Sequence, residues 1–375
     1  MEHSIMSGAL NQRGLQTYLT NRIYDALYFP RFFPMKQVSQ LTIQTLIGAE
    51  GNRVAADIVS YDSAAPLKRR VPTDKLTTEI PAIRIARKMS EVNLNEYFGF
   101  MALANNAGEN RALELVFDDV NFVVDGCLAR MEWMALQAMS QTAIALTTTN
   151  NAGIVTTTDV TFQMPSTRKE YIGSAGGTAA TTHYWTAAAK ATNDPITDIM
   201  VIQREAAGYG VRFTKILMNL SKWQDFVLST AVQNFVFSVL YQGTAVRYAP
   251  TLGQVNAALT AHQYPIIEVI DQRVDIEDAS HDRTSTDPWL NSSSADKYVL
   301  FVPSDELGNM LWCPTAEEKA KPPQAMHAKK GSILVSKFSE TNPVAEFTVG
   351  LINTFPSWPK IDQCWSLNTE LYTSW

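Results

Sequence analysis

The longest regular pattern of apolar residues lies between about 109 and 146. Its side chains recur at steps of three and four residues, which is typical of one face of an α-helix; they are Leu113, Val116, Val120, Val123, Val124, Cys127, Met131, Met134 and Ala138. A helix of about 35 residues spans about 50 Å, far beyond the ordinary length of about 11–12 residues. Because no heptad with flanking charge pairs is sustained, we predict a single girder helix.

Alternating apolar and polar residues before this helix predict strands at 41–61 and 76–88. The residues between them carry Lys68, Arg69 and Arg70 and predict the tip of a long two-stranded hairpin. An isolated hairpin is at best marginally stable in water, so this one needs a surface on which to dock. We expect the basic residues to contact carboxylates of a neighbouring protein. Solubilising charge at a hairpin tip is the competing interpretation, and direct contact with DNA is the weaker alternative.

The N-terminal segment combines a short amphipathic helix with an aromatic stretch. A helix within residues 1–26 places Leu15, Leu19 and Ile23 on one face. The following residues, 28–35, hold two prolines and are predicted to be extended. Four aromatic residues lie beside these prolines: Tyr28, Phe29, Phe32 and Phe33. The rings cannot form a core by themselves. They must lie on the body of the chain or on another chain, and we favour contact between chains.

The second half of the chain alternates helices and strands. Asp194 followed by Pro195 predicts a helix start, with an N-cap residue before proline at the first helical position. The helix that follows the next strand is predicted to start at Ser221 as its cap. The predicted helices are 194–210, 221–241 and 251–262, and the predicted strands are 147–164, 212–220, 265–277 and 297–305. The remaining residues are strand-rich to the end, so the chain is of mixed helix and strand content.

Length and composition bound the class of protein. The 375 residues allow roughly two to three folding units, and 46% hydrophobic residues exclude disorder. Only 18% of residues are charged, against a typical value of about 25%. This indicates either extensive contact with partners or a threonine-rich surface. The net charge of −6 argues against a dedicated duplex-DNA binder, which needs a basic excess to neutralise phosphates.

Cysteines and apolar runs give no sign of disulfides or membrane insertion. Cys127, Cys313 and Cys364 are odd in number and far apart, so they form neither a disulfide framework nor a metal-binding pair, and a reducing cytosol suits them. No apolar run reaches about 18 residues. The first residues also lack the basic-then-apolar order of a signal peptide.

Candidate chemistry is sparse. No phosphate-binding, dinucleotide-binding or nucleophile-elbow motif is present, and the five histidines are scattered. The densest polar cluster is Asp271, Asp275, Glu277, Asp278, His281, Asp282 and Asp287. It lacks the EF-hand pattern, so a solvated loop is favoured over a cation site. We therefore predict no catalytic residue, no metal and no cofactor.

The order of the parts resembles the major capsid proteins of tailed phages, with the Hong Kong phage (HK-ninety-seven-like) fold. The resemblance is closest to the lambda-type capsid protein E family and spans nearly the whole chain. It rests on five segments: IYDALYFPRFF (23–33), DIVSYDSAAPLKRR (57–70), IPAIRIARKM (80–89), the girder helix with Arg111 and Ala112 near its start, and IDQCWSLNTELYTSW (361–375).

The resemblance implies an α+β capsid fold with four parts. They are an N-terminal arm (1–55), an E-loop hairpin (56–92), a peripheral β-sheet domain with the spine helix (93–193 and 336–375), and an axial α/β domain (194–335). Within the axial domain, the acidic loop becomes a candidate for the capsomer axis or an outer face through Asp278, His281, Asp282 and Asp287. The arm and hairpin become contacts between subunits.

The implied function is that of a phage major capsid protein, not an enzyme, which forms hexamers and pentamers of an icosahedral head around double-stranded DNA. Copies of itself are the main partners, and the packaged DNA is bound only non-specifically. A portal, a decoration protein and a separate scaffold protein are further candidates, the last because no long helical leader precedes the arm. Assembly is expected in the host cytoplasm, without a membrane. The alternatives are an encapsulin-type compartment and a soluble α/β enzyme with a polar site near Asp271–Asp287.

Overall fold

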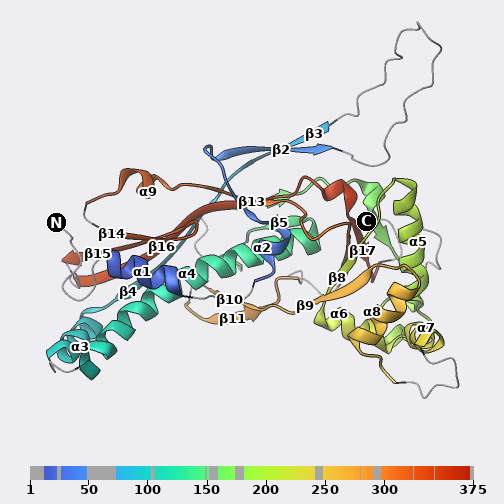
Figure 1. The fold of residues 1–375 in the computed structure, drawn as a ribbon, viewed down its shortest axis with the longest axis horizontal. Helices are drawn as coiled ribbons and strands as arrows, with labels where there is room; N and C mark the ends of the chain where they lie inside the picture. The colour runs from blue at the N-terminus through green and yellow to red at the C-terminus, as the bar shows by residue number, and fades with distance from the viewer. Residues whose placement is uncertain are drawn as a thin grey trace, which may run out of the picture. The chain divides into compact units, whose positions relative to one another are not determined.

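The computed structural model describes most of the chain (Figure 1), as two compact units that we treat separately. The described residues are 12–22, 27–48, 73–102, 106–147, 150–151, 159–173, 181–240, 248–278, 280–289, 297–323, 325–341 and 343–371. Within them, the unit that we call the sheet unit comprises 12–43, 78–134 and 309–357. The α/β unit comprises the described parts of 44–77, 135–308 and 358–375.

The sheet unit is built on six strands in the order β1-β13-β16-β15-β14, with β4 paired to β16. The strands are β1 (Met35–Gln37), β4 (Ala82–Met89), β13 (Asn309–Cys313), β14 (Met326–Lys330), β15 (Ile333–Thr341) and β16 (Val344–Ser357). The helices of this part are α1 (Gln12–Asn21), α2 (Phe29–Phe32), α3 (Glu91–Ala102), α9 (Ala316–Ala320) and most of α4 (Asn106–Gln141). The girder helix predicted at 109–146 is therefore confirmed as α4.

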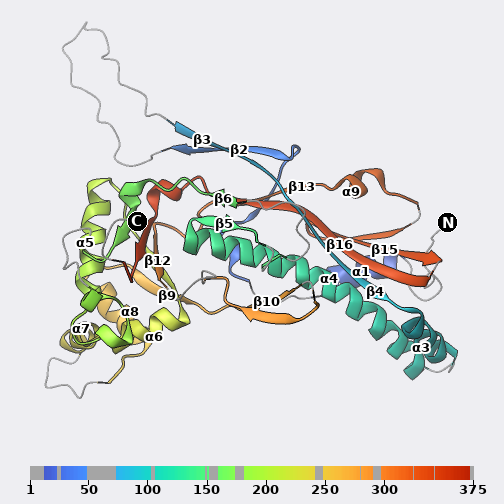
Figure 2. The same ribbon diagram turned by 180° about the vertical axis from the view of Figure 1, so that it is seen from behind.

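Helix α4 packs closely against strands β4 and β16 of this sheet (Figure 2). A Cβ atom on Gly350 of β16 would lie 2.8 Å from the Val123 carbonyl oxygen, and a Cβ atom on Gly126 of α4 would collide with Ile85 of β4. The apolar face of the helix is buried at these positions, as the sequence pattern predicts. Two glycines, one on each element, thus allow the helix and the sheet to approach each other closely.

Helix α1 covers the edge strand β14. Leu15 and Leu19 are fully buried, as predicted, whereas Ile23 lies outside the described residues. The Gln16 amide mimics a neighbouring strand, because its Nε2 donates to the Lys329 carbonyl and its Oε1 accepts from the Lys329 amide, both at 2.8 Å. The side chain thereby satisfies the exposed edge of the sheet.

The α/β unit contains a five-stranded sheet in the order β7-β17-β12-β8-β9. Its strands are β7 (Lys169–Tyr171), β8 (Lys215–Asn219), β9 (Ile266–Ile270), β12 (Tyr298–Val302) and β17 (Trp365–Asn368). Its helices are α5 (Pro195–Gly208), α6 (Leu220–Leu228), α7 (Thr230–Leu240) and α8 (Leu252–Ala261). Two short hairpins accompany the sheet, β5 (Ala143–Ala145) with β6 (Asp159–Thr161) and β10 (Val274–Glu277) with β11 (Arg283–Thr286). Trp185, Phe226, Phe301 and Trp365 belong to its hydrophobic core.

Side chains cap the first turns of α5 and α6, and one of the two caps differs from the residue that the sequence predicted. Asp194 accepts a hydrogen bond from the Thr197 amide at 3.2 Å and caps α5, as predicted. The helix expected to be capped by Ser221 is instead capped by Asn219, whose Oδ1 accepts from the Lys222 amide at 3.0 Å. This helix also ends at Leu228, and α7 follows it as a separate helix.

Sheet membership differs from the domain boundaries expected from the sequence. The expected peripheral domain joined 93–193 to 336–375. The pairing of β17 with β7 agrees with this, whereas β17 also pairs with β12, which was expected in the axial domain. Residues 309–335, expected in the axial domain, belong to the sheet unit. The difference arises because strand partners are chosen by contacts distant in sequence, which an alternating pattern does not specify. No helix in the described parts of the chain is long and apolar enough to cross a membrane.

Candidate assembly surfaces

The aromatic stretch after α1 is folded onto its own chain. Residues Phe29–Phe32 form one short helical turn instead of the predicted extended segment. Phe29, Phe32 and Phe33 are almost completely buried, and Tyr28 is half-buried. This corrects the expectation that all four rings lie on another chain, because three of them already fill the core of the sheet unit. Arg31 stays exposed, with its guanidinium 4.4 Å from the Phe32 ring centre.

A buried carboxylate on α4 fixes this stretch. Glu132 is fully buried; its Oε1 accepts from the Tyr28 amide at 2.9 Å, and its Oε2 accepts from the Phe29 amide at 2.8 Å. Burial raises the pKa of Glu132, and the two backbone hydrogen bonds oppose that rise. The carboxylate takes the place of an N-cap side chain for α2. Sequence reasoning missed this residue, although a lone glutamate in the apolar stretch 131–136 was an available signal.

The chain then joins the edge of the sheet. The Pro34 carbonyl accepts from the Met310 amide at 3.0 Å, and the Val38 amide donates to the Trp312 carbonyl at 2.8 Å. Between these bonds β1 runs parallel to β13. The N-terminal arm is therefore part of the sheet unit from residue 28 to residue 38.

The structure describes the two strands at the base of the expected hairpin. β2 (Thr42–Gly48) pairs with β3 (Thr73–Glu79), and the Ile80 amide donates to the Leu41 carbonyl at 2.8 Å at its base. The hairpin base thus confirms strands on either side of the predicted tip. The tip itself, with Lys68, Arg69 and Arg70, lies outside the described residues.

Charged side chains connect the strands of the sheet unit to α4. Arg87 of β4 contacts Asp118 at 2.6 Å and Asp119 at 3.2 Å. Lys337 is fully buried and donates to the Thr348 hydroxyl at 3.3 Å. Burial lowers the pKa of Lys337, while the neighbouring carboxylates of Glu346 and Asp119 act in the opposite direction. Buried charges of this kind need their partners, because removing one partner leaves an uncompensated charge.

The acidic loop is the turn of the β10–β11 hairpin. Asp278 accepts hydrogen bonds from the amides of Ser280 at 2.8 Å and Asp282 at 3.0 Å. His281, exposed and with φ of 67°, contacts Glu277 at 2.8 Å. The His281 hydrogen bond lowers the pKa of Glu277. These carboxylates therefore shape the turn.

Asp287 faces a different environment from the rest of the loop. Its Oδ1 accepts from the Trp289 amide at 2.9 Å, and its Oδ2 accepts from the Asn219 side chain at 3.3 Å. The structure therefore does not group Asp287 with Asp278 and Asp282 as the sequence cluster did. Over the described ranges, no three histidine, cysteine or acidic side chains are grouped as metal ligands.

Helix α3 leaves large apolar side chains in solvent. It buries Leu94 and Tyr97 against the sheet unit, whereas Val92 is 67% exposed and Phe98 is 47% exposed. Large contiguous apolar surfaces mark sites of contact between proteins, and these two exposed side chains make α3 a candidate for such a site. Sequence reasoning had not predicted this short helix.

The long helix beneath a β-sheet, the hairpin that precedes it and the separate α/β unit together define the Hong Kong phage capsid fold. A protein assigned as a capsid protein of a prophage from E. coli CFT073 shares it at 14% identity, with a TM-score of 0.56 over 96% of this chain and 99% of that chain. A phage-related protein from Bordetella bronchiseptica RB50 shares it at 12% identity, with a TM-score of 0.51 over 95% and 96% of the two chains. The predicted fold class is confirmed.

The family follows from the sequence itself. The model of the family described as phage major capsid protein E matches residues 16–286, and the chain belongs to this family. None of the curated proteins matches the chain. The predicted role, that of a tailed-phage major capsid protein and component of the virion head, is confirmed, and the comparisons lend no support to a compartment for enzyme cargo or to a soluble enzyme.

Proposed function

We propose that copies of this chain assemble into hexamers and pentamers, and that these close into an icosahedral head around double-stranded DNA. The observation that carries the proposal is the β2–β3 hairpin. Over the described residues, β2 and β3 pair with each other and with no other strand. Because a two-stranded hairpin is only marginally stable alone, a second copy of the chain is the surface on which we place it. Symmetry then repeats the contact around a closed shell.

We place the basic tip against an acidic surface of a neighbouring copy. Glu114, Asp118 and Asp125 are exposed on α4. At about 100° per residue they lie within about 40° of one another around the helix axis. Arg87 and Arg22 already contact two of these carboxylates. Exposed ion pairs contribute about 0–1 kcal/mol each, so Lys68, Arg69 and Arg70 would set the register of the hairpin more than its affinity.

Other surfaces complete the proposed contacts between subunits. In the arm, Tyr28 is half-buried, and Pro30 and Arg31 are exposed, so this side of α2 remains available to a neighbour. The β10–β11 turn is exposed at Asp278, His281 and Asp282, which suits a position at the capsomer axis or on an outer face. Asp287 is only partly exposed and is hydrogen-bonded to Trp289 and Asn219, so we propose a smaller part for it in that surface.

The role proposed is structural and not enzymatic. Glu132 caps a helical turn, Asp278 closes the β10–β11 turn and Arg87 forms ion pairs, which are structural uses of these side chains. We propose that assembly takes place in the host cytoplasm with a separate scaffold protein, a portal and a decoration protein as partners. Packaged DNA would be held without sequence preference, because a subunit of net charge −6 lacks the basic excess for tight phosphate binding.

Charge reversal at the hairpin tests the proposal. The double variant Arg69→Glu and Arg70→Glu should remain folded by circular dichroism but lose most particles in electron micrographs and in velocity sedimentation. The matched control, Lys190→Glu with Arg212→Glu, makes the same charge change at exposed positions of the α/β unit and should keep its particles. Normal particles at normal yield from the hairpin variant would refute the assigned role of the tip.

A further inference from the structure

The last strand in the described part of the chain, β17, lies inside the α/β unit. β17 is the second of five strands and is buried at every position. It pairs antiparallel with β12 on one side and parallel with β7 on the other. Trp365 packs in the same core as Phe301 and Ile216. Without β17, the strands β7 and β12 would have no hydrogen-bonded connection to each other.

The residues after β17 are also fixed by hydrogen bonds. The Thr369 amide and hydroxyl donate to the Lys297 carbonyl at 2.7 and 2.8 Å. The Thr369 carbonyl accepts from the Trp185 amide at 3.1 Å, and the Leu371 carbonyl accepts from the Ile172 amide at 2.7 Å. The C-terminal segment therefore holds together three parts of the unit that are distant in sequence.

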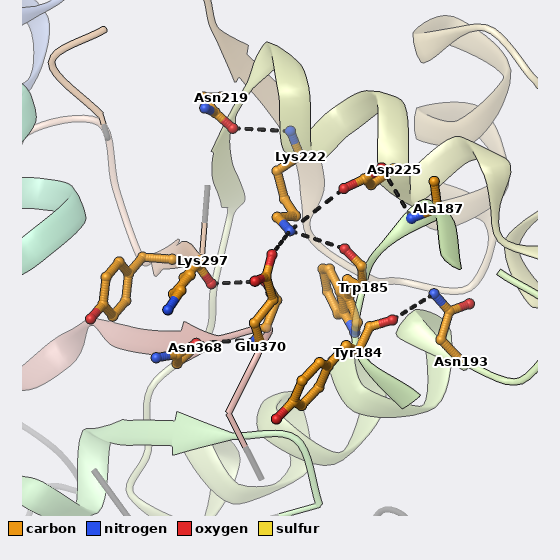
Figure 3. A network of polar contacts seen from close by, with 12 residues as sticks. Tyr184, Trp185, Ala187, Asn193, Asn219, Lys222, Asp225, Lys297, Asn368 and Glu370 are labelled. Atoms are coloured by element: carbon orange, nitrogen blue, oxygen red, sulfur yellow. Dashed lines mark hydrogen bonds and ion pairs between the residues drawn. The ribbon is translucent and has the colours of Figure 1, made fainter. Parts of the chain in front are cut away.

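A buried ammonium group depends on this segment (Figure 3). Lys222 of α6 has no exposed surface. Its Nζ donates to the Trp185 carbonyl at 3.0 Å and to Glu370 Oε1 at 3.1 Å, whereas Asp225 lies farther away at 3.8 Å. Glu370 is thus the nearest opposite charge, and it arrives only with the C-terminal segment.

The order of synthesis separates the two partners in time. β12 ends at Val302 and β17 begins at Trp365. At about 5–20 residues per second, the intervening residues take roughly 3–12 s to synthesise. During this interval Lys222 lacks its nearest carboxylate, Glu370, and keeps only Asp225 at 3.8 Å. Burying an ammonium that has lost its closer partner is unfavourable. The α/β unit is therefore disfavoured from folding completely before the C-terminal segment has been synthesised.

We propose that Lys222 and Glu370 form a latch that makes folding of the α/β unit conditional on insertion of the C-terminal segment. A subunit whose last residues are missing or displaced keeps this unit open and does not enter a shell. The readout in shells rests on the proposed self-assembly, but the latch itself is measurable in unassembled subunits.

Hydrogen exchange of full-length, unassembled subunits tests the latch with the wild type and four variants. Glu370→Gln keeps an acceptor oxygen but removes the charge, and it should speed amide exchange in β7, β8 and β12 by about tenfold or more. Asp225→Asn is the matched control, because it removes the more distant carboxylate, and it should have a smaller effect. Lys222→Met alone and Lys222→Met with Glu370→Gln complete the cycle.

The double variant decides between a latch and a general loss of stability. If Glu370 acts by compensating Lys222, the Glu370→Gln substitution should have little effect on exchange in the Lys222→Met background. The shell yield of Glu370→Gln should fall and that of the double variant should recover. Equal effects of Glu370→Gln in both backgrounds, or of Asp225→Asn and Glu370→Gln, would overturn the latch. If wild-type protein forms no shells, the proposed function fails while the exchange data still decide the latch.

Discussion

Gly350 of β16 faces the Val123 carbonyl of α4 so closely that a Cβ atom at this glycine would lie 2.8 Å from the carbonyl oxygen. The neighbouring atom belongs to helix backbone, so it cannot move aside as a flexible side chain would. Gly350 is therefore, with Gly126 on the helix, one of two positions at which the absence of a side chain allows the sheet and the girder helix to approach this closely.

Gly350→Ala should destabilise the sheet unit by about 1–3 kcal/mol, because the strand must move away from α4. Urea unfolding of unassembled subunits measures the change. Gly253→Ala is the control, since a Cβ atom there meets no atom within 4 Å. A helical glycine replaced by alanine should leave stability unchanged or raise it by up to about 1 kcal/mol. Equal stability of the two variants would contradict this account of the helix–sheet contact.

Glu132→Gln should loosen the N-terminal arm. An amide offers one acceptor oxygen, so one of the two amides of Tyr28 and Phe29 loses its partner in a buried place. We expect a loss of about 1–3 kcal/mol and faster proteolysis between residues 27 and 38. Glu114→Gln, an exposed position on the same helix, should behave as wild type. If the Glu132→Gln variant resists the protease as well as wild type does, the Glu132 carboxylate does not hold the N-terminal arm in place.

Titration of the buried Asp198 carboxyl should make the free energy of unfolding depend on pH, with a sign that follows from its pKa. Burial raises the pKa of Asp198 from 3.8 to about 6, although its carboxylate accepts from Trp185 Nε1 at 2.8 Å. Because the folded pKa exceeds the unfolded one, stability is fully present below about pH 4 and falls as the pH rises to about 6. Asp198→Asn keeps the acceptor and removes the titration. Relative to wild type, its free energy of unfolding should therefore rise by roughly 1–3 kcal/mol between pH 4 and pH 7. Parallel pH profiles of the two proteins would rule this out.

Phe98→Ser should reduce assembly without lowering the stability of the subunit. The ring is 47% exposed, so little buried surface is lost in the monomer, whereas a contact with a neighbouring copy would lose its aromatic anchor. Particle yield in electron micrographs and urea unfolding measure the two effects. Asn93→Ser on the same helix is exposed and should change neither. Unchanged particle yield for Phe98→Ser would exclude α3 from the interfaces.

The sequence predicts the helices of this fold better than the places of its strands. The spacing of apolar residues in α4 and the Asp194-Pro195 start of α5 are local signals, and both are confirmed. The partners of β17 are not local. Nothing in IDQCWSLNTELYTSW specifies pairing with Lys169–Tyr171, which lies almost 200 residues earlier.

The aromatic stretch shows the same limit at the level of the site. Two prolines indicated an extended segment, but proline is also favoured in the first turn of a helix, and the carboxylate of Glu132 stabilises that turn. The rings of Phe29, Phe32 and Phe33 were correctly expected to need a cover. The sequence could not show that the cover is the chain's own core. The basic tip of the hairpin stays a prediction.

Electron microscopy with sedimentation of the purified wild-type chain is the most direct test of the central claim that this subunit builds a shell from copies of itself. The account predicts closed particles or capsomer rings in the megadalton range. A uniform population of monomers or small oligomers, under conditions in which the chain is folded and the hairpin is intact, would contradict it.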